Sequence, residues 1–244
     1  MKITIFRYKG KIGHFLRAES NRSSLTYPVP PRTVLLGIIG AILGMEKDEP
    51  QQLLNDAHIA VSGVIPRTHW HCVKLRKDPP ATLSLVVTAK TKTNKKETAP
   101  EKAALIRQEW LWQPDFTVYA AMPDPYIDDL ASRIHDRRWH FTPSLGLSEM
   151  LADILPYGDR LVDAEKLSSG IHDVGTVIPQ QAGELDTGAI FSRGLALQSL
   201  RMPRDVTEDR VFTHASYYVE RDAKPVPFKT SAAWQVGNET VVFL

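Results

Sequence analysis

The hydrophobic pattern at the N-terminus predicts a strand followed by a buried helix. Residues 3–6 form a short β-branched and aromatic run, and residues 12–18 continue it after a Lys-Gly-Lys break. Three prolines within residues 28–31 remove backbone N–H donors, so the sheet is expected to end there. Residues 32–44 then have apolar side chains on every side, which is typical of a helix buried in a core.

Three glycines interrupt this predicted helix. Gly37, Gly40 and Gly44 lie three and four residues apart, so they fall on one stripe of the helix surface. Because glycine has no side chain, such a stripe lets the helix backbone lie close to a sheet or to another chain. Gly44 also has the position of a helix C-cap.

The middle of the chain is expected to be mainly strands. Residues 90–100 hold four lysines and no apolar side chain beyond Ala99, so this segment gains nothing by burial. We expect it to be a mobile basic loop or the tip of an extended hairpin. The elements expected around it are a short helix at 50–57 and strands at 58–65, 67–76, 81–89, 107–113 and 116–122.

The second half begins with helices and ends in short strands. Residues 124–138 carry apolar side chains at helical spacing, and a turn at 141–146 leads to a second expected helix at 147–155. The order of elements predicts an α+β, ferredoxin-like domain over residues 1–160. Residues 161–244 are expected to form a small β-rich extension packed on the same domain, with short strands at 175–178, 211–219 and 240–244.

Composition indicates a folded protein. Hydrophobic residues make up 43% of the chain and charged residues 24%, which is close to the average of globular proteins. No apolar run approaches the roughly 18 residues that would suggest a membrane span. The single cysteine, Cys72, excludes an internal disulfide and fits a reducing compartment. We therefore expect a cytoplasmic protein without a membrane partner.

Charge is distributed unevenly along the chain. Residues 1–45 hold seven Lys or Arg against one acid, and residues 66–107 hold ten against three. Residues 108–244 hold twelve bases and twenty acids. A basic half joined to an acidic half favours a polyanion on one side and a protein neighbour on the other. The alternative is a chance fluctuation of solvated surface charge.

The residues give little indication of a metal site or of nucleophilic catalysis. His69 and His71 share one face of a predicted strand and Cys72 takes the other, so the three cannot converge locally on a metal. The chain has no G-x-S-x-G elbow, and no Gly-Lys-Ser/Thr follows the glycines at 37–44. We expect no metal and no cofactor.

RNA is the polyanion that the residue types favour. Lys and Arg neutralise phosphates, while aromatic rings such as Tyr8, Phe15, Tyr27 and Trp70 can stack on splayed bases, although at least one of Phe15 and Trp70 is expected in the core. A metal-free ribonuclease is the alternative. It needs a base, an acid and a cation, which His14, Tyr8, Lys11 and Tyr27 could supply.

Three motifs resemble the CRISPR-associated "Cas five" family. Residues 26–44 (TYPVPPRTVLLGIIGAILG) resemble its first-helix motif, and residues 107–119 (RQEWLWQPDFTVY) its paired strands. Residues 142–152 (TPSLGLSEMLA) are similar to its turn and helix. The motifs stand in the family's order and cover about residues 1–155.

The resemblance implies an RRM-like domain with an extended β-hairpin "thumb" at about residues 75–112. It further implies a Cascade subunit that caps the 5′ handle of the guide RNA (crRNA). That subunit contacts the backbone subunit "Cas seven" and the large subunit, and meets target DNA only indirectly. In the type I-C branch the subunit itself cuts the repeat RNA. The match is nearer to type I-B, in which a separate subunit does so.

We therefore expect a non-catalytic guide-RNA-binding subunit in antiviral defence. Close backbone packing is expected at Gly37, Gly40, Gly44 and Gly146. The residues expected to contact RNA are Tyr8, Lys9, Lys11, His14, Arg17, Arg22, Tyr27, Arg32, Thr33, Lys74, Arg76, Lys77, Lys90, Lys92, Lys95, Lys96 and Ser144.

Overall fold

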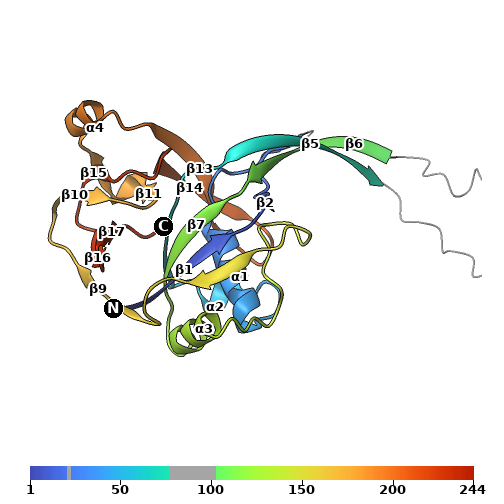
Figure 1. The fold of residues 1–244 in the computed structure, drawn as a ribbon, viewed down its shortest axis with the longest axis horizontal. Coiled ribbons are helices and arrows are strands. Elements are labelled where there is room, and N and C mark those ends of the chain that lie inside the picture. Colours follow the sequence, from blue (N-terminus) through green and yellow to red (C-terminus); the bar gives the residue numbers. More distant parts are fainter. Residues whose placement is uncertain (21–22, 77–102) are drawn as a thin grey trace, which may run out of the picture.

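A seven-stranded sheet organises the chain in the computed structural model, which describes residues 1–20, 23–76 and 103–244 (Figure 1). Its order is β17-β16-β9-β1-β7-β4, and β8 also pairs with β1. Every pairing is antiparallel. The strands are β1 (Lys2–Lys9), β4 (His58–Ser62), β7 (Asp115–Ala121), β8 (Asp153–Pro156), β9 (Val162–Lys166), β16 (Trp234–Val236) and β17 (Glu239–Val241).

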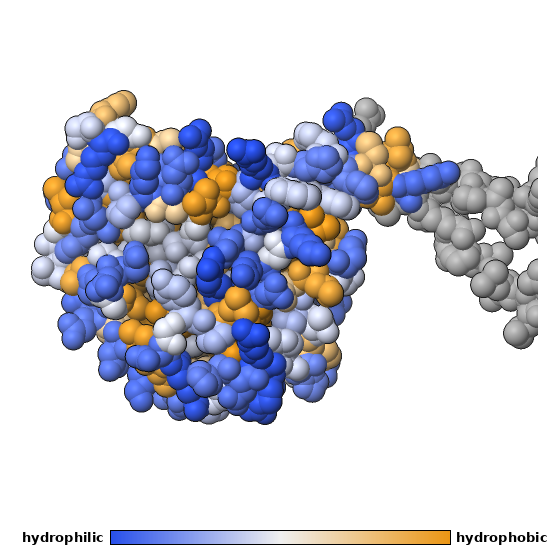
Figure 2. Space-filling model, viewed as in Figure 1, coloured by the Kyte–Doolittle hydropathy of each residue, from blue (hydrophilic) through white to orange (hydrophobic). Residues whose placement is uncertain are grey.

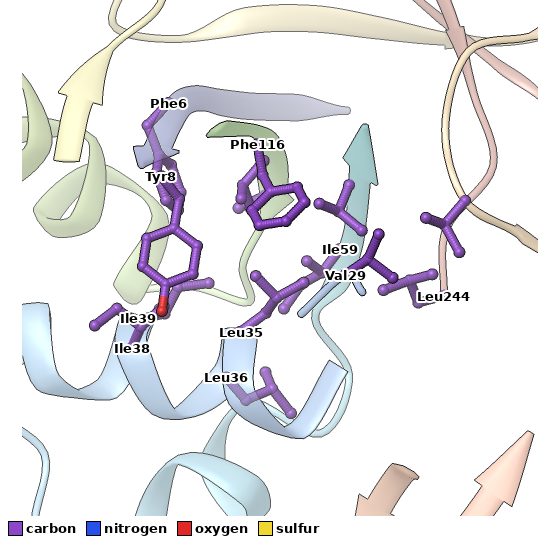
Figure 3. Packing of buried hydrophobic residues seen from close by; sticks show 14 of the residues in the cluster. Phe6, Tyr8, Val29, Leu35, Leu36, Ile38, Ile39, Ile59, Phe116 and Leu244 are labelled. Atoms are coloured by element: carbon purple, nitrogen blue, oxygen red, sulfur yellow. The ribbon is translucent and has the colours of Figure 1, made fainter. Parts of the chain in front are cut away.

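Three helices lie on one side of this sheet (Figure 1): α1 (Arg32–Leu43), α2 (Glu49–Leu53) and α3 (Tyr126–His135). Phe6 and Tyr8 of β1 point toward Leu35 and Ile39 of α1, and all four side chains are fully buried (Figure 3). The hydrophobic run of residues 32–44 thus supplies the main core. The predicted helix is confirmed, and Pro31 precedes it with extended backbone angles.

The other side of β1 is also covered. Ile3 and Ile5 pack with Ala164, Val236 and Val241 from β9, β16 and β17. Because side chains alternate along a strand, one short run supplies two separate cores. The C-terminal strands therefore complete the layer that the N-terminal strand begins.

A long hairpin leaves the body of the protein (Figure 1). β5 (Arg67–Arg76) and β6 (Ala103–Trp112) pair antiparallel, from Arg67 opposite Trp112 to Arg76 opposite Ala103. The bounds of β5 confirm the predicted strand, and this paired region begins eight residues before the expected thumb boundary at 75. The other edge of β6 pairs with β2 (Ile12–Gly13) and β3 (Ser23–Ser24). Residues 77–102, with the expected strand at 81–89 and lysine-rich segment at 90–100, lie outside the described residues.

The C-terminal part adds two small sheets and a core of its own. Val174, Ile178, Val226 and Phe228 are buried there together. The first sheet is β10 (Gly170–Val174), β15 (Val226–Thr230) and β12 (Gly183–Leu185). The second is β11 (Ile178–Pro179), β14 (Phe212–Glu220) and β13 (Leu197–Val206), and the remaining elements are η1 (Gln180–Ala182) and α4 (Thr187–Arg193).

An ion pair between a buried arginine and a half-buried aspartate joins α1 to this C-terminal part. Arg32 is only 3% exposed. Its Nη1 donates to Asp205 Oδ1 at 2.7 Å, and its Nη2 donates to the carbonyl oxygen of Asn55 at 2.6 Å. Burial lowers the pKa of Arg32, and the carboxylate of Asp205 opposes that shift. The guanidinium is therefore held by protein groups.

The expected helix at 147–155 is wrong. Leu145 N donates to Met150 O at 2.7 Å across a turn, Ser144 bridges to Leu151, and β8 begins at Asp153. Ile154 pairs with Tyr8 and is buried. Pairing with the edge of β1 therefore overrides local helix propensity. The strand expected at 12–18 is likewise limited to β2, followed by a single bridge between Leu16 and Thr26.

The structure has α+β architecture with far more strands than helices. Within the described residues, no helix has both the length and the apolar character needed to cross a bilayer.

The glycines of α1 differ in their surroundings. A Cβ at Gly40 would overlap the ring of Pro50, whereas a Cβ at Gly37 would meet nothing within 4 Å. Gly44 has a φ of 86° and caps the helix, with its N–H donating to Gly40 O at 2.8 Å. Within this chain, the predicted close approach is therefore confirmed at Gly40 and wrong for Gly37.

This contrast predicts opposite effects of the same substitution. Gly37→Ala should stabilise the protein by about 0.5–1 kcal/mol, because alanine restricts the unfolded chain and favours the helix. Gly40→Ala should destabilise it by about 1–3 kcal/mol, because Pro50 must move. Urea unfolding of the two variants measures both changes. Equal effects would contradict the assigned packing.

Candidate nucleic-acid interface

One face of the β5–β6 hairpin concentrates basic and aromatic side chains. We call it the His-Trp face, and its members alternate along the two strands. Arg67, His69 and His71 are exposed, and Trp112 is 54% exposed. Figure 2 shows hydrophilic and hydrophobic side chains interleaved where the hairpin leaves the body. Its cross-strand pairs are Arg67 with Trp112, His69 with Trp110, and His71 with Gln108.

The rings on this face are already oriented. The rings of His71 and Trp110 are stacked, with centroids 4.0 Å apart and planes inclined by 25°. Trp110 Nε1 donates to Gln108 Oε1 at 3.2 Å, which fixes the indole further. Rigid aromatic rings beside cations are the usual means of holding unpaired bases and their phosphates.

The opposite face of the hairpin, which we call the Arg107 face, holds the N-terminal segment at its base. Thr26 N donates to Glu109 Oε2 at 3.2 Å, and His14 Nδ1 lies 2.8 Å from Glu109 O. Farther out, the guanidinium carbon of Arg107 lies 4.9 Å from the ring centroid of Trp70. Lys74 is exposed on this face. This face is thus partly structural.

Three predicted cations lie near the base of the hairpin. Lys11 is exposed, and its carbonyl oxygen accepts from Gln113 N at 2.9 Å, just after β6. Lys9 is half-buried at the end of β1. Arg17 Nε donates to Thr26 O at 2.9 Å, and its guanidinium lies 5.6 Å from the ring centroid of Tyr27.

A cleft of about 1180 Å³ opens where the His-Trp face meets the body. Arg67 and Trp112 line it from the hairpin, Thr117 and Tyr119 from β7, and Tyr157 from the segment after β8. The C-terminal part contributes Gln198, Arg221, Asp222 and Glu239. Ile65 N donates to Arg221 O at 2.9 Å, which fixes the two walls relative to each other.

Two of the three arginines in the cleft are paired. Arg7 binds Asp115 through two hydrogen bonds, and Arg221 Nε lies 3.4 Å from Asp222 Oδ1. Among the residues that the structure describes, Arg67 has no carboxylate and Glu239 no cation within 4.0 Å. The cleft therefore offers one free cation and one free carboxylate.

Comparison with known proteins identifies the family. Residues 5–223 match the family described as CRISPR-associated protein (Cas_Cas5). The chain belongs to this family. No curated protein matches the chain.

One solved structure shows a related fold, and a second has a slightly lower TM-score. A CRISPR protein from Archaeoglobus fulgidus has a TM-score of 0.52 and 14% sequence identity, covering 99% of this chain and 98% of that chain. A chain of a CRISPR RNA-guided surveillance complex has a TM-score of 0.49 and 17% identity, covering 92% of this chain and 91% of that chain.

Four of the residues expected to contact RNA are buried in this Cas_Cas5 chain: Tyr8, His14, Tyr27 and Arg32. Tyr8 Oη donates to Ser144 O at 2.6 Å, and burial raises its pKa. Tyr27 Oη donates to Glu19 Oε2 at 3.1 Å, and burial together with that carboxylate raises its pKa to about 12. None of these four side chains is accessible at the surface of the protein. The predicted RNA-binding surface therefore does not include them.

The remaining expected residues divide into two sets. Ser144 is half-buried, and its carbonyl oxygen accepts the hydrogen bond from Tyr8 Oη. Thr33 is also half-buried, and its carbonyl oxygen accepts from Gln51 Nε2 at 2.9 Å. Gly146 fits its predicted role, because a Cβ there would overlap His14 O and its φ is 96°. Arg22, the side chain of Arg76, Lys77, Lys90, Lys92, Lys95 and Lys96 lie outside the described residues.

The predicted set of RNA contacts includes neither the His-Trp face nor the cleft. A signal for the face was present, since Trp110 and Trp112 alternate with polar residues, as Arg67, His69 and His71 do. Nothing local could indicate the cleft, because its walls come from segments that are far apart in the sequence. In the described part of the chain, no three His, Cys, Asp or Glu side chains gather as a metal site requires.

Two buried tyrosines provide a test of the assigned interior. Tyr8→Phe should destabilise the protein by about 1 kcal/mol, because it leaves Ser144 O without its partner. Tyr217 is equally buried, but its hydroxyl has no hydrogen-bond partner among the described residues. Tyr217→Phe should therefore be neutral or stabilising. Thermal unfolding compares the two, and RNA affinity should be unchanged in both variants. A loss of RNA affinity in well-folded Tyr8→Phe would restore Tyr8 to the binding surface.

Proposed function

We propose that this Cas_Cas5 chain is the guide-RNA-binding subunit of a type I CRISPR effector complex. In this role it caps the 5′ handle of the guide RNA and contacts the backbone and large subunits during antiviral DNA interference. The subunit contacts target DNA only indirectly, through other parts of the complex. Membership of the family supports the assignment to CRISPR immunity.

The His-Trp face is the observation that carries RNA binding. It combines the free cation Arg67 with exposed histidines and two tryptophans on a surface that projects from the body. Single-stranded RNA is bound by this combination, because stacking tolerates any base while cations follow the phosphates. Lys11 adds exposed positive charge at the hairpin base, and Lys74 adds it farther out on the Arg107 face.

The proposed fold is a ferredoxin-like domain with a thumb. Support comes from the order β8-β1-β7-β4 with antiparallel neighbours and the chain order β1, α1, β4, β7, α3, β8. That is the split β-α-β arrangement of RRM-like domains. The β5–β6 hairpin inserted between β4 and β7 would be the base of the thumb.

We further propose that the subunit does not cut RNA. The hydroxyl of Tyr8 and the ring of His14 are buried and engaged with backbone carbonyl groups, so neither can reach a 2′-hydroxyl at the surface. A metal-free ribonuclease is the alternative. In that case the exposed imidazoles of His69 and His71 on the His-Trp face would serve as base and acid.

Removing the aromatic stack should weaken RNA binding. The double variant His71→Ala/Trp110→Ala should bind fluorescently labelled repeat RNA roughly tenfold or more weakly, because each lost base stack costs about 1–3 kcal/mol. Trp139→Ala is the matched control, since Trp139 is also half-buried but follows α3 and is not part of the hairpin. Equal affinities of the two variants would contradict the binding surface.

Removing exposed charge should change the salt dependence as well. Lys11→Ala/Lys74→Ala should reduce the slope of log affinity against log salt by about 1.4, since each phosphate contact to a single strand contributes about 0.7. Arg138→Ala/Lys166→Ala removes two exposed cations elsewhere and should leave the slope unchanged. An unchanged slope in the first variant would exclude these lysines from the interface.

Cleavage is tested by incubating the purified protein with labelled repeat RNA in EDTA. RNA that is retained but uncut is the expected result. A specific cut that disappears in His69→Ala or His71→Ala would overturn the non-catalytic assignment and favour the ribonuclease.

A further inference from the structure

We propose that the cleft binds a single unstacked guanosine nucleotide of the RNA strand and selects it by its base. This inference rests on the proposed RNA-binding function and assigns a specific ligand to a part of the surface that the function alone leaves open. It follows from three features of the cleft: its connection to the His-Trp face, its free charges and its aromatic walls.

The cleft continues the His-Trp face without interruption. Arg67 and Trp112 form the last cross-strand pair of that face and at the same time line the cleft. A strand of RNA lying along the face therefore reaches the cleft at its next nucleotide. The volume of about 1180 Å³ accommodates one nucleotide with its hydration.

The charges of the cleft fit a nucleotide. Arg7 is paired with Asp115, and Arg221 is paired with Asp222. Arg67 is therefore the arginine of the cleft that is available to bind a phosphate. Trp112 and Tyr157 are 54% and 52% exposed, so each offers a free ring to a base.

Glu239 is the residue that distinguishes guanine from uracil. An added Cβ at Gly175 would lie 2.9 Å from Glu239 Oε2, so the glycine leaves that carboxylate its space. A carboxylate has two acceptor oxygens and no donor. Guanine presents two adjacent donors on its Watson–Crick edge, N1–H and the exocyclic amino group, and so pairs with both oxygens. Uracil presents one N–H between two carbonyl oxygens, which a carboxylate repels.

The test uses the full-length protein and RNA octamers of uridine that carry one guanosine at each position in turn. The wild-type protein should bind one of these octamers about tenfold more tightly than octauridine, as expected for a bidentate pair. Glu239→Gln should abolish that preference without weakening octauridine binding. The NH2 group of glutamine is a donor, so it would face one of the two guanine donors without forming a hydrogen bond. Tyr157→Ala, which alters the cleft and leaves the hairpin intact, should weaken binding of the preferred octamer about tenfold.

Matched controls are Glu184→Gln and Phe191→Ala, which change an exposed acid and an exposed ring in the C-terminal part outside the cleft. Neither should affect the preference. Circular dichroism melting of every variant verifies folding, and Glu239 is exposed, so its substitution leaves the core intact.

The outcomes separate this inference from the proposed function. If His71→Ala/Trp110→Ala weakens RNA binding while the cleft variants retain wild-type preference, RNA binding stands and the guanosine site is wrong. If the wild-type protein binds no octamer and no repeat RNA, both are wrong. If the cleft variants keep their RNA affinity and lose co-purification of a protein subunit, the cleft is a protein-docking surface and the inference is overturned.

Discussion

Burial of β1 on both faces is the constraint on which the remaining structure depends. Phe6 and Tyr8 require the cover of α1, while Ile3 and Ile5 require the C-terminal strands. Each large side chain so buried contributes about 1.5–3 kcal/mol relative to exposure. The strand is therefore stable only when segments from the N-terminal and the C-terminal parts of the chain are folded around it. The C-terminal strands therefore help to stabilise the N-terminal strand, and the walls of the cleft come from both parts of the chain.

Positive charge in the N-terminal region serves two different purposes. Arg32 binds Asp205 inside the protein, Arg7 binds Asp115, and Arg17 lies against Tyr27. These arginines fix segments to each other, so an excess of bases in the sequence overstates the charge that remains for a polyanion. Lys11, Lys74 and Arg67 remain exposed. The surface potential thus depends on which cations the fold has already paired.

The two faces of the hairpin have different contacts, and the aromatic part of the proposed binding surface lies on the His-Trp face. Its Arg107 face is held to the N-terminal segment through Glu109, whose side chain and carbonyl oxygen are both engaged. That attachment fixes the direction of the hairpin. The His-Trp face is left with stacked and exposed rings, and rigid rings lose little conformational freedom when a base binds. The orientation of this face therefore depends on the contacts between Glu109 and the N-terminal segment.

The sequence by itself determined the family motifs, the strand at 67–76, the buried helix with its C-cap at Gly44, and the side-chain alternation that places His69 and His71 together. These follow from local periodicity and backbone chemistry, which act over a few residues. Tertiary structure decided that Tyr8, His14, Tyr27 and Arg32 are interior and that residues 153–156 form a strand. It also assembled the cleft. Periodicity shows which side chains share a face, but whether that face is covered depends on contacts between segments distant in the chain.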